Sequence, residues 1–264
     1  DFRFDWQYDF DSNGFSCISC YKEQNEHIIE EHGKINSQGQ FVVSSKAEDL
    51  ELFHIIPDGF DWAYYCSEET FIGVKNDKKG VFNYDGTEII SAEYNDIQPV
   101  NDIYIVRKDC KAGVLADTGE VILPLVFNFI EIIEDPYSGR RYYKCNNSGN
   151  YGLYNLDGSE LIPTNYSQIA FLAYNLLLIQ GTDSKFMIFH SKGTCINSEC
   201  FDAVFDFGKP LKKREFSFEN PKEIEDPLYA IVQKNGLYGA INSLGVTEIY
   251  PKYKELYCVN RKVF

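Results

Sequence analysis

The chain has 264 residues, 44% of them hydrophobic and 16% aromatic, which supplies enough apolar surface for a folded core and argues against a disordered protein. No apolar run reaches the roughly 18 residues of a membrane-spanning helix, so no membrane association is expected. The formal net charge is −15, and residues 1–100 account for −13 of it with 20 acidic against 7 basic residues, which disfavours nucleic acid as a partner and favours a basic protein.

The N-terminal segment DFRFDWQYDFD alternates aromatic with polar residues over positions 1–11. Alternation with a period of two is typical of a half-buried strand. Because this strand precedes the repeats described below, it could close a ring of sheets by joining the last one, or it could cap an open array.

Three short motifs follow that resemble parts of ligand sites. DFDSNG, residues 9–14, matches the first half of a calcium loop, but Cys20 stands at the twelfth position, where a bidentate Glu is needed. If CISC, residues 17–20, is a strand, its two thiols point to opposite faces, and the two histidines of HIIEEH, residues 27–32, do the same. We therefore expect turns and strands here, and neither a metal nor another cofactor.

Glycines recur along most of the chain at intervals of 33 to 52 residues. The anchor glycines of this pattern are Gly39, Gly86, Gly119, Gly158, Gly193 and Gly245. A second glycine lies six residues earlier in five copies, at Gly33, Gly80, Gly113, Gly152 and Gly239, and Met187 replaces it in the remaining copy. A register that holds over six copies indicates a structural repeat.

Each repeat predicts a hairpin turn followed by a strand. In the N-x-x-G pattern the asparagine closes a turn on its own backbone and the glycine takes a positive φ, as a hairpin loop with a bulge requires. Paired apolar residues after the turn, such as Ile89-Ile90 and Leu161-Ile162, fit a strand covered on both faces. Another apolar segment precedes the first glycine, for example FIGV at 71–74, so about four short strands and few helices are expected.

Four strands in a unit of about 40 residues suit a propeller blade. We predict an all-β repeat protein of about six four-stranded units, β-propeller-like, that forms a single domain over residues 1–264. An open β solenoid of stacked hairpins would use the same periodicity and is the alternative fold.

The units resemble the WG repeat, also called the KWG repeat, over roughly residues 25–260. AGVLADTGEVILPLVFNFI, residues 112–130, and YGLYNLDGSELIPTNYSQI, residues 151–169, are most similar to it. The signature tryptophan is replaced throughout, by His32, Lys79, Ala112, Tyr151, Phe186 and Tyr238. The family occurs in bacterial proteins, and the resemblance implies a binding or scaffolding repeat without a catalytic set.

The longest interval between anchors contains an insertion, residues 208–227, whose first half is basic. Insertions in repeat arrays map to loops on one face, often the binding face. Together with acidic residues of the N-terminal part they form the candidate partner-binding set, which consists of Asp58, Asp61, Glu68, Glu69, Lys212, Lys213 and Arg214.

The eight cysteines are scattered irregularly through a chain too long to depend on disulfide bonds for its stability. They are Cys17, Cys20, Cys66, Cys110, Cys145, Cys195, Cys200 and Cys258. We predict reduced thiols, most of them buried in the core, and a cytoplasmic location for the protein.

These features favour a non-enzymatic module that binds a protein partner. Its most specific form is a bacterial immunity or antitoxin-like protein that neutralises a basic toxin through the acidic N-terminal face. The alternative is a glycan- or peptide-binding repeat that uses exposed aromatic residues, since the chain has 19 Tyr and 20 Phe. No nucleophile signature occurs in the sequence, so an enzyme would need a site assembled from distant residues, and this is the less favoured third alternative.

Overall fold

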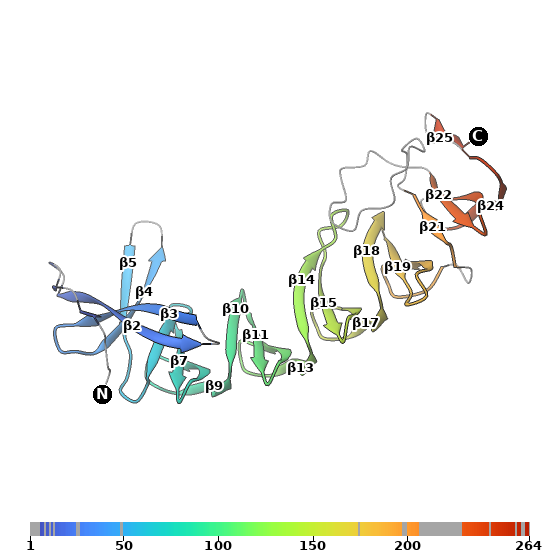
Figure 1. Cartoon of the computed structure of the whole chain (residues 1–264). Coiled ribbons are helices and arrows are strands. Elements are labelled where there is room, and N and C mark those ends of the chain that lie inside the picture. Colours follow the sequence, from blue (N-terminus) through green and yellow to red (C-terminus); the bar gives the residue numbers. More distant parts are fainter. Residues whose placement is uncertain are drawn as a thin grey trace. The chain divides into compact units, whose positions relative to one another are not determined.

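The computed structural model describes residues 6–7, 9–10, 12, 14–24, 27–47, 50–173, 175–196, 200–205, 229–242, 244–256, 258–259 and 262–263. The chain packs into two compact units, residues 1–125 and 126–264, which are described separately. Every regular element among the described residues is a β-strand (Figure 1). No helix in this part of the chain is long and apolar enough to cross a membrane.

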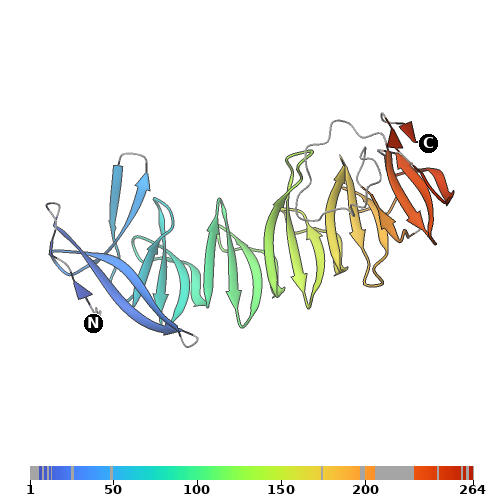
Figure 2. The same cartoon turned by 45° about the horizontal axis from the view of Figure 1, so that its top comes forward.

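The first unit contains three sheets, in each of which strands that follow one another in the chain are neighbours (Figure 1, Figure 2). The first sheet comprises β1 (Trp6–Gln7), β2 (Phe15–Gln24), β3 (His27–Asn36), β4 (Phe41–Ala47) and β5 (Leu50–Ile55). The second comprises β6 (Trp62–Tyr65), β7 (Thr70–Lys75), β8 (Lys78–Asn83) and β9 (Glu88–Tyr94). The third comprises β10 (Asp96–Val100), β11 (Ile103–Lys108), β12 (Lys111–Ala116) and β13 (Val121–Phe127), whose end passes the boundary of the unit.

The second unit continues the same order with three larger sheets and a short hairpin. The fourth sheet comprises β14 (Phe129–Glu134), β15 (Arg141–Asn147), β16 (Asn150–Tyr154) and β17 (Glu160–Tyr166), and the fifth comprises β18 (Gln168–Ala173), β19 (Leu176–Gln180) and β20 (Phe186–His190). The sixth comprises β21 (Ala203–Val204), β22 (Tyr229–Lys234), β23 (Leu237–Asn242) and β24 (Thr247–Tyr253), and β25 (Cys258–Val259) pairs with β26 (Lys262–Val263).

These sheets confirm the predicted all-β repeat of about six propeller-like units. The fifth sheet has two isolated bridges, Phe189 to Cys195 and Phe186 to Phe201, in place of a fourth strand. At the N-terminus, Trp6 and Gln7 pair with Ser19 and Ile18, so the described part of the alternating segment belongs to the first sheet. The single domain, and the choice between a closed ring and an open array, stay predictions.

The anchor glycines lie in the turns between the third and fourth strands, as predicted. In the first sheet the Asn36 side-chain oxygen accepts hydrogen bonds from the backbone N–H groups of Gln38 and Gln40, at 3.1 and 2.9 Å. The earlier glycine of each pair allows two strands to approach closely. In the second sheet this glycine is Gly80, and the register between β8 and β9 shifts at it, between Lys79 and Val81. A Cβ on Gly80 would lie 2.6 Å from the carbonyl oxygen of Ile90, so only glycine fits.

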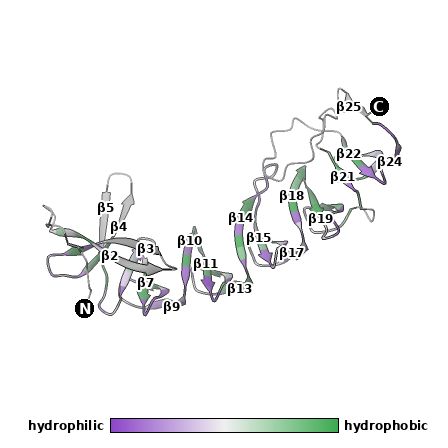
Figure 3. Cartoon of the chain, viewed as in Figure 1, coloured by the Kyte–Doolittle hydropathy of each residue, from purple (hydrophilic) through white to green (hydrophobic). Residues whose placement is uncertain are grey.

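Successive sheets within a unit enclose apolar cores between them. Between the second and third sheets the core consists of Ile72, Val81, Ile90, Tyr94, Ile97, Tyr104, Val106 and Leu115. Between the fourth and fifth sheets the core consists of Tyr142, Leu153, Ile162, Ile169, Phe171, Leu177, Ile179 and Phe189. Figure 3 shows hydrophobic stretches on strands β14 and β18 of these two sheets. Burial of one such Ile or Leu side chain contributes about 1.5–3 kcal/mol, so these cores stabilise the packing of neighbouring sheets within a unit.

One polar residue stands directly before the first strand of most sheets and caps a hairpin of the same sheet. The backbone N–H of Asn95 donates to the carbonyl oxygen of Arg107 at 2.8 Å, and its side-chain oxygen accepts the N–H of Asp109 at 3.0 Å. We call these positions the capping residues, and they are Asp61, Asn95, Asn128, Ser167 and Asp202. In four of these sheets the capping residue is the only residue between the first strand and the preceding strand or bridge. The connection to the preceding sheet is therefore a single residue long.

Candidate functional site

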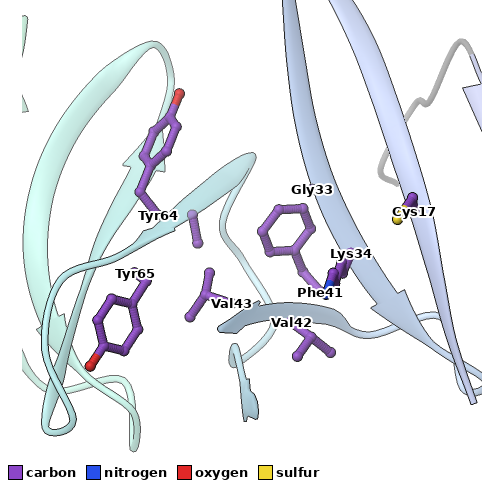
Figure 4. Close-up of a pocket in the computed structure, with 9 residues that line it drawn as sticks. Cys17, Gly33, Lys34, Phe41, Val42, Val43, Tyr64 and Tyr65 are labelled. Carbon is purple, nitrogen blue, oxygen red and sulfur yellow. The ribbon is translucent and has the colours of Figure 1, made fainter. Parts of the chain in front are cut away.

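A pocket of about 550 Å³ lies between the first and second sheets of the first unit (Figure 4). Three strands of the first sheet and β6 of the second sheet form its walls. The lining residues are Cys17, Gly33, Lys34, Phe41, Val42, Val43, Ala63, Tyr64 and Tyr65.

The apolar floor of the pocket depends on the glycine of the first repeat. Phe41 and Val42 are both buried, and the Phe41 ring lies 4.8 Å from that of Trp62. A Cβ on Gly33 would come within 2.7 Å of the Phe41 ring and 3.1 Å of the Trp62 ring, so the absence of a side chain lets the two rings meet below β3. The indole nitrogen of Trp62 is buried and has no hydrogen-bond partner among the described residues.

The wall opposite β3 is β6, an edge strand of the second sheet that pairs only with β7 in the described sheets. Figure 4 shows the rings of Tyr64 and Tyr65 turned away from Phe41 and from each other, as expected for neighbouring residues of a strand. The amine of Lys79 lies 5.3 Å from the centre of the Tyr64 ring. The backbone of β6, rather than its aromatic rings, therefore faces the pocket.

Two reactive groups stand at the side of the pocket formed by the first sheet. Cys17 and Lys34 are direct cross-strand partners on β2 and β3, and Cys17 is an exposed free thiol. The nine lining residues include neither a carboxylate nor a histidine. An apolar floor, one amine and an edge strand make this pocket suited to binding an extended chain with an apolar side chain.

Beyond Tyr65, a stack of rings fixes one end of the second sheet. His54 stacks on Tyr84 with 4.1 Å between the ring centres, and the Tyr84 hydroxyl donates a hydrogen bond to the carbonyl oxygen of Ser67 at 3.0 Å. Burial, and then the neighbouring Tyr65 and Cys66, raise the pKa of Tyr84 well above its ordinary value. The hydroxyl therefore stays protonated and keeps the loop between β6 and β7 in place.

The predicted acidic binding residues occupy two separate places in the second sheet. Asp58 and Asp61 precede β6, whereas Glu68 and Glu69 follow it, so the pairs lie at opposite ends of this strand. All four are exposed, and Asp61 is a capping residue whose carboxylate accepts the N–H of Asn76 at 2.6 Å. Their role in binding stays a prediction, and Lys212, Lys213 and Arg214 lie outside the described residues.

The N-terminal motifs form strands rather than ligand sites. CISC belongs to β2 and HIIEEH to β3, as expected. Asp11 and Asn13 of DFDSNG lie outside the described residues. In the part of the chain that the structure describes, no group of three or more His, Cys, Asp or Glu side chains is arranged to hold a metal ion.

The prediction of mostly buried cysteines is wrong for the six whose side chains are described. None of the six forms a disulfide bond, but Cys145 alone is buried, whereas Cys17, Cys110 and Cys195 are exposed. Cys110 lies in the turn between β11 and β12, and Cys195 follows the turn after β20, so both occupy hairpin ends rather than strand interiors. Cysteine is small enough to fit either a core or a turn, so its presence in the sequence does not reveal which of the two it occupies.

A family model described as "WG containing repeat" matches residues 80–111. Residues 80–111 are thus similar to a WG-containing repeat. The matched stretch begins at Gly80 in β8, contains the turn at Gly86, and ends at the start of β12. It therefore spans the junction between the second and third sheets, including the capping residue Asn95 and its partner Asp109.

Several solved structures share distant similarity with the chain. They include BamB from Moraxella catarrhalis (12% identity, 96% of this chain and 77% of that one, TM-score 0.27), PorZ of the type-IX secretion system of Porphyromonas gingivalis (8%, 85% and 32%, 0.28) and Hsv2 from Kluyveromyces lactis (8%, 86% and 70%, 0.28). At these scores the likeness says nothing about function. No curated protein matches the sequence.

The pocket and the capping residues were missed by sequence reasoning. The pocket joins residues of β2, β3 and β4 to residues of β6, which no periodicity relates. The capping residues did have a signal, because Asn95, Asn128, Ser167 and Asp202 each stand nine residues after an anchor glycine. A polar residue at one constant offset in four copies is typical of a turn-capping position.

Proposed function

We propose that this chain is a non-enzymatic repeat module that binds a basic protein through the acidic part of residues 1–100. The WG-containing repeat and the antiparallel sheets support an interaction module. The observation that carries the proposal is the state of the acidic side chains: Asp58, Glu68 and Glu69 are exposed and form no ion pair with another described residue. Such carboxylates attract a cationic surface at long range.

The specific form of this proposal is the neutralisation of a basic toxin. A toxin domain that acts on nucleic acid carries a cationic surface, and an acidic protein with a net charge of −13 in its first hundred residues would cover that surface. Complementary charge accelerates association at low ionic strength, and salt weakens this acceleration.

Charge reversal in a pull-down from lysate of the source organism tests the proposal. The variant Asp58→Lys, Asp61→Asn, Glu68→Lys, Glu69→Lys keeps the hydrogen-bond acceptor at position 61. The matched control, Glu120→Lys, Glu134→Lys, Asp157→Asn, Glu160→Lys, changes the net charge equally at exposed positions outside residues 1–100. We expect a basic protein that the native chain and the control retain and that the variant retains at least tenfold less. Equal retention by all three chains would overturn the proposal.

Recognition of an extended peptide is the second candidate function. The observation that favours it is the edge strand β6 along the pocket, because an open strand edge accepts a further strand through backbone hydrogen bonds. Binding of this kind would change little between low and high salt, which distinguishes it from capture by the acidic residues. Replacement of Ala63 by proline, in the middle of β6, would weaken peptide binding and leave salt-sensitive binding unchanged.

A further inference from the structure

One contact between two successive sheets recurs in both units. In the first unit the turn of the third sheet lies on β9, where a Cβ on Gly119 would be 2.8 Å from the carbonyl oxygen of Ile89. In the second unit the turn of the fifth sheet lies on β17, where a Cβ on Gly193 would be 2.5 Å from the carbonyl oxygen of Leu161. Ile89 and Leu161 each stand three residues after an anchor glycine, so in both of these pairs the turn of the later sheet covers the fourth strand of the sheet before it.

The turn of the first sheet does not make this contact with any described residue. A Cβ on Gly39 would meet no atom within 4 Å, although the glycine has the same positive φ as the other turn glycines. Ser37, Gln38 and Gln40 around it are exposed. The turn Asn36–Gln40 is thus formed like the others and covers no strand among the described residues.

The fourth strand of the sixth sheet, β24, is the element that another turn would cover, and its side chains are exposed. By the same offset, Glu248 on β24 corresponds to Ile89 on β9. The aromatic residue eight positions after the anchor is buried by the following sheet in the second repeat, where Tyr94 is 7% exposed, whereas its counterpart Tyr253 on β24 is 44% exposed. Tyr250, nearby on the same strand, is 65% exposed.

The turn before β24 extends this apolar surface. Leu244 and Val246 are 71% and 50% exposed. Their counterparts in the second, third and fourth sheets are polar, namely Asp85 and Thr87, Thr118 and Glu120, and Asp157 and Ser159. An apolar substitution at positions that are otherwise polar and exposed indicates a contact surface.

The sequence regions that contain these two surfaces also differ in charge. Residues 229–264 contain five Lys or Arg and two Asp or Glu, a net charge of +3, against −13 for residues 1–100. The C-terminal region of one molecule is therefore attracted to the N-terminal region of another, whereas each region repels its own counterpart in a second copy.

We propose that two copies of this chain associate head to tail, with the turn Asn36–Gln40 of one copy on β24 of the other. The inter-sheet contact inside each unit is the template for this interface, which uses a different surface on each copy and is heterologous. We call Asn36–Gln40 the head surface and Leu244, Val246, Tyr250 and Tyr253 the tail surface. This inference is independent of the proposed function.

The experiment measures the mass of the full chain by sedimentation velocity and by light scattering at increasing protein concentration. The tail variant is Tyr250→Asp with Tyr253→Asp, and the head variant is Ser37→Asp with Gln38→Asp, which places acids opposite Glu248. The control, Val121→Asp with Leu156→Asp, adds the same charges at exposed apolar positions outside both surfaces. A thermal melt of each variant verifies that it is folded.

We expect the native chain and the control to form dimers and larger species as concentration rises, and each variant alone to stay monomeric. An equimolar mixture of the two variants retains one intact head and one intact tail surface, so it should form a dimer and nothing larger. A native chain that is monomeric at every concentration would overturn the proposal. So would a mixture that stays monomeric while the native chain associates, because that result indicates a symmetric interface.

Discussion

The side-chain oxygen of Asn95 accepts a hydrogen bond from the backbone N–H of Asp109 at 3.0 Å, across 14 residues of sequence. Asp109 has a φ of 51°, and the capped residue has a similar φ at Asn76, Ser148 and Asn235. One polar residue thus holds in place both the start of a sheet's first strand and the two-residue turn between its second and third strands.

Loss of one cap should weaken the unit measurably. Asn95→Ala removes the acceptor and leaves the Asp109 N–H to water, so we expect a loss of about 0.5–1.5 kcal/mol in the free energy of unfolding. Urea denaturation followed by tyrosine fluorescence measures it. Asn95→Asp keeps an acceptor and should restore most of the loss, whereas Asn165→Ala, at an exposed position, should stay within about 0.5 kcal/mol of the native chain. Equal effects at positions 95 and 165 would contradict the capping role.

A side chain at Gly80 should be far more harmful than one at an open glycine. Gly80→Ala forces a Cβ against the backbone of β9, and we expect destabilisation of about 2–3 kcal/mol, as for an overpacked core. Gly139→Ala meets no atom within 4 Å and costs only the strain of its φ of 69°, about 1 kcal/mol. Denaturation of the two variants side by side checks the order, and a milder effect at position 80 would refute the close approach of β8 and β9.

Acid should weaken the sixth sheet through Asp202. The ion pair with Lys185, at 2.9 Å, and the N–H of Asn235 lower the pKa of Asp202 below its ordinary value of 3.8. Because the folded-state pKa is the lower one, the stabilisation is present above the unfolded pKa and is lost as the pH falls through the folded value. The urea midpoint should therefore decrease below about pH 4. Asp202→Asn should reduce this decrease, and an unchanged slope in the variant would exclude Asp202 as its source.

Thiol reactivity should separate the cysteines by burial. Burial raises the pKa of Cys145 to about 12, so almost no thiolate forms at pH 8. Cys17, Cys110 and Cys195 are exposed, and iodoacetamide should alkylate them within the time that leaves Cys145 intact. Peptide mass spectrometry before and after unfolding reads out each site. Rapid labelling of Cys145 in the folded chain would contradict its position in the interior of the fourth sheet.

The fold could be predicted from the sequence because its determinants are local. Turn glycines, the asparagine at Asn36 and apolar pairs such as Ile89-Ile90 act within a few residues of one another. The pocket could not be predicted, because Lys34 and Ala63 approach only after two sheets stack. The acidic residues were identified by charge alone, and charge does not reveal that Asp61 and Glu68 flank the same strand at opposite ends.

The single-residue joints between sheets limit where the chain can change in length. The turns between second and third strands are also short, with two residues at 76–77, 109–110, 148–149 and 235–236 and five at 181–185 in the fifth sheet. The connections between first and second strands differ instead, with four residues at 66–69, two at 101–102, six at 135–140 and 24 at 205–228. These connections can therefore change in length while the strand order of each sheet is preserved, much as antibody loops vary on a constant framework.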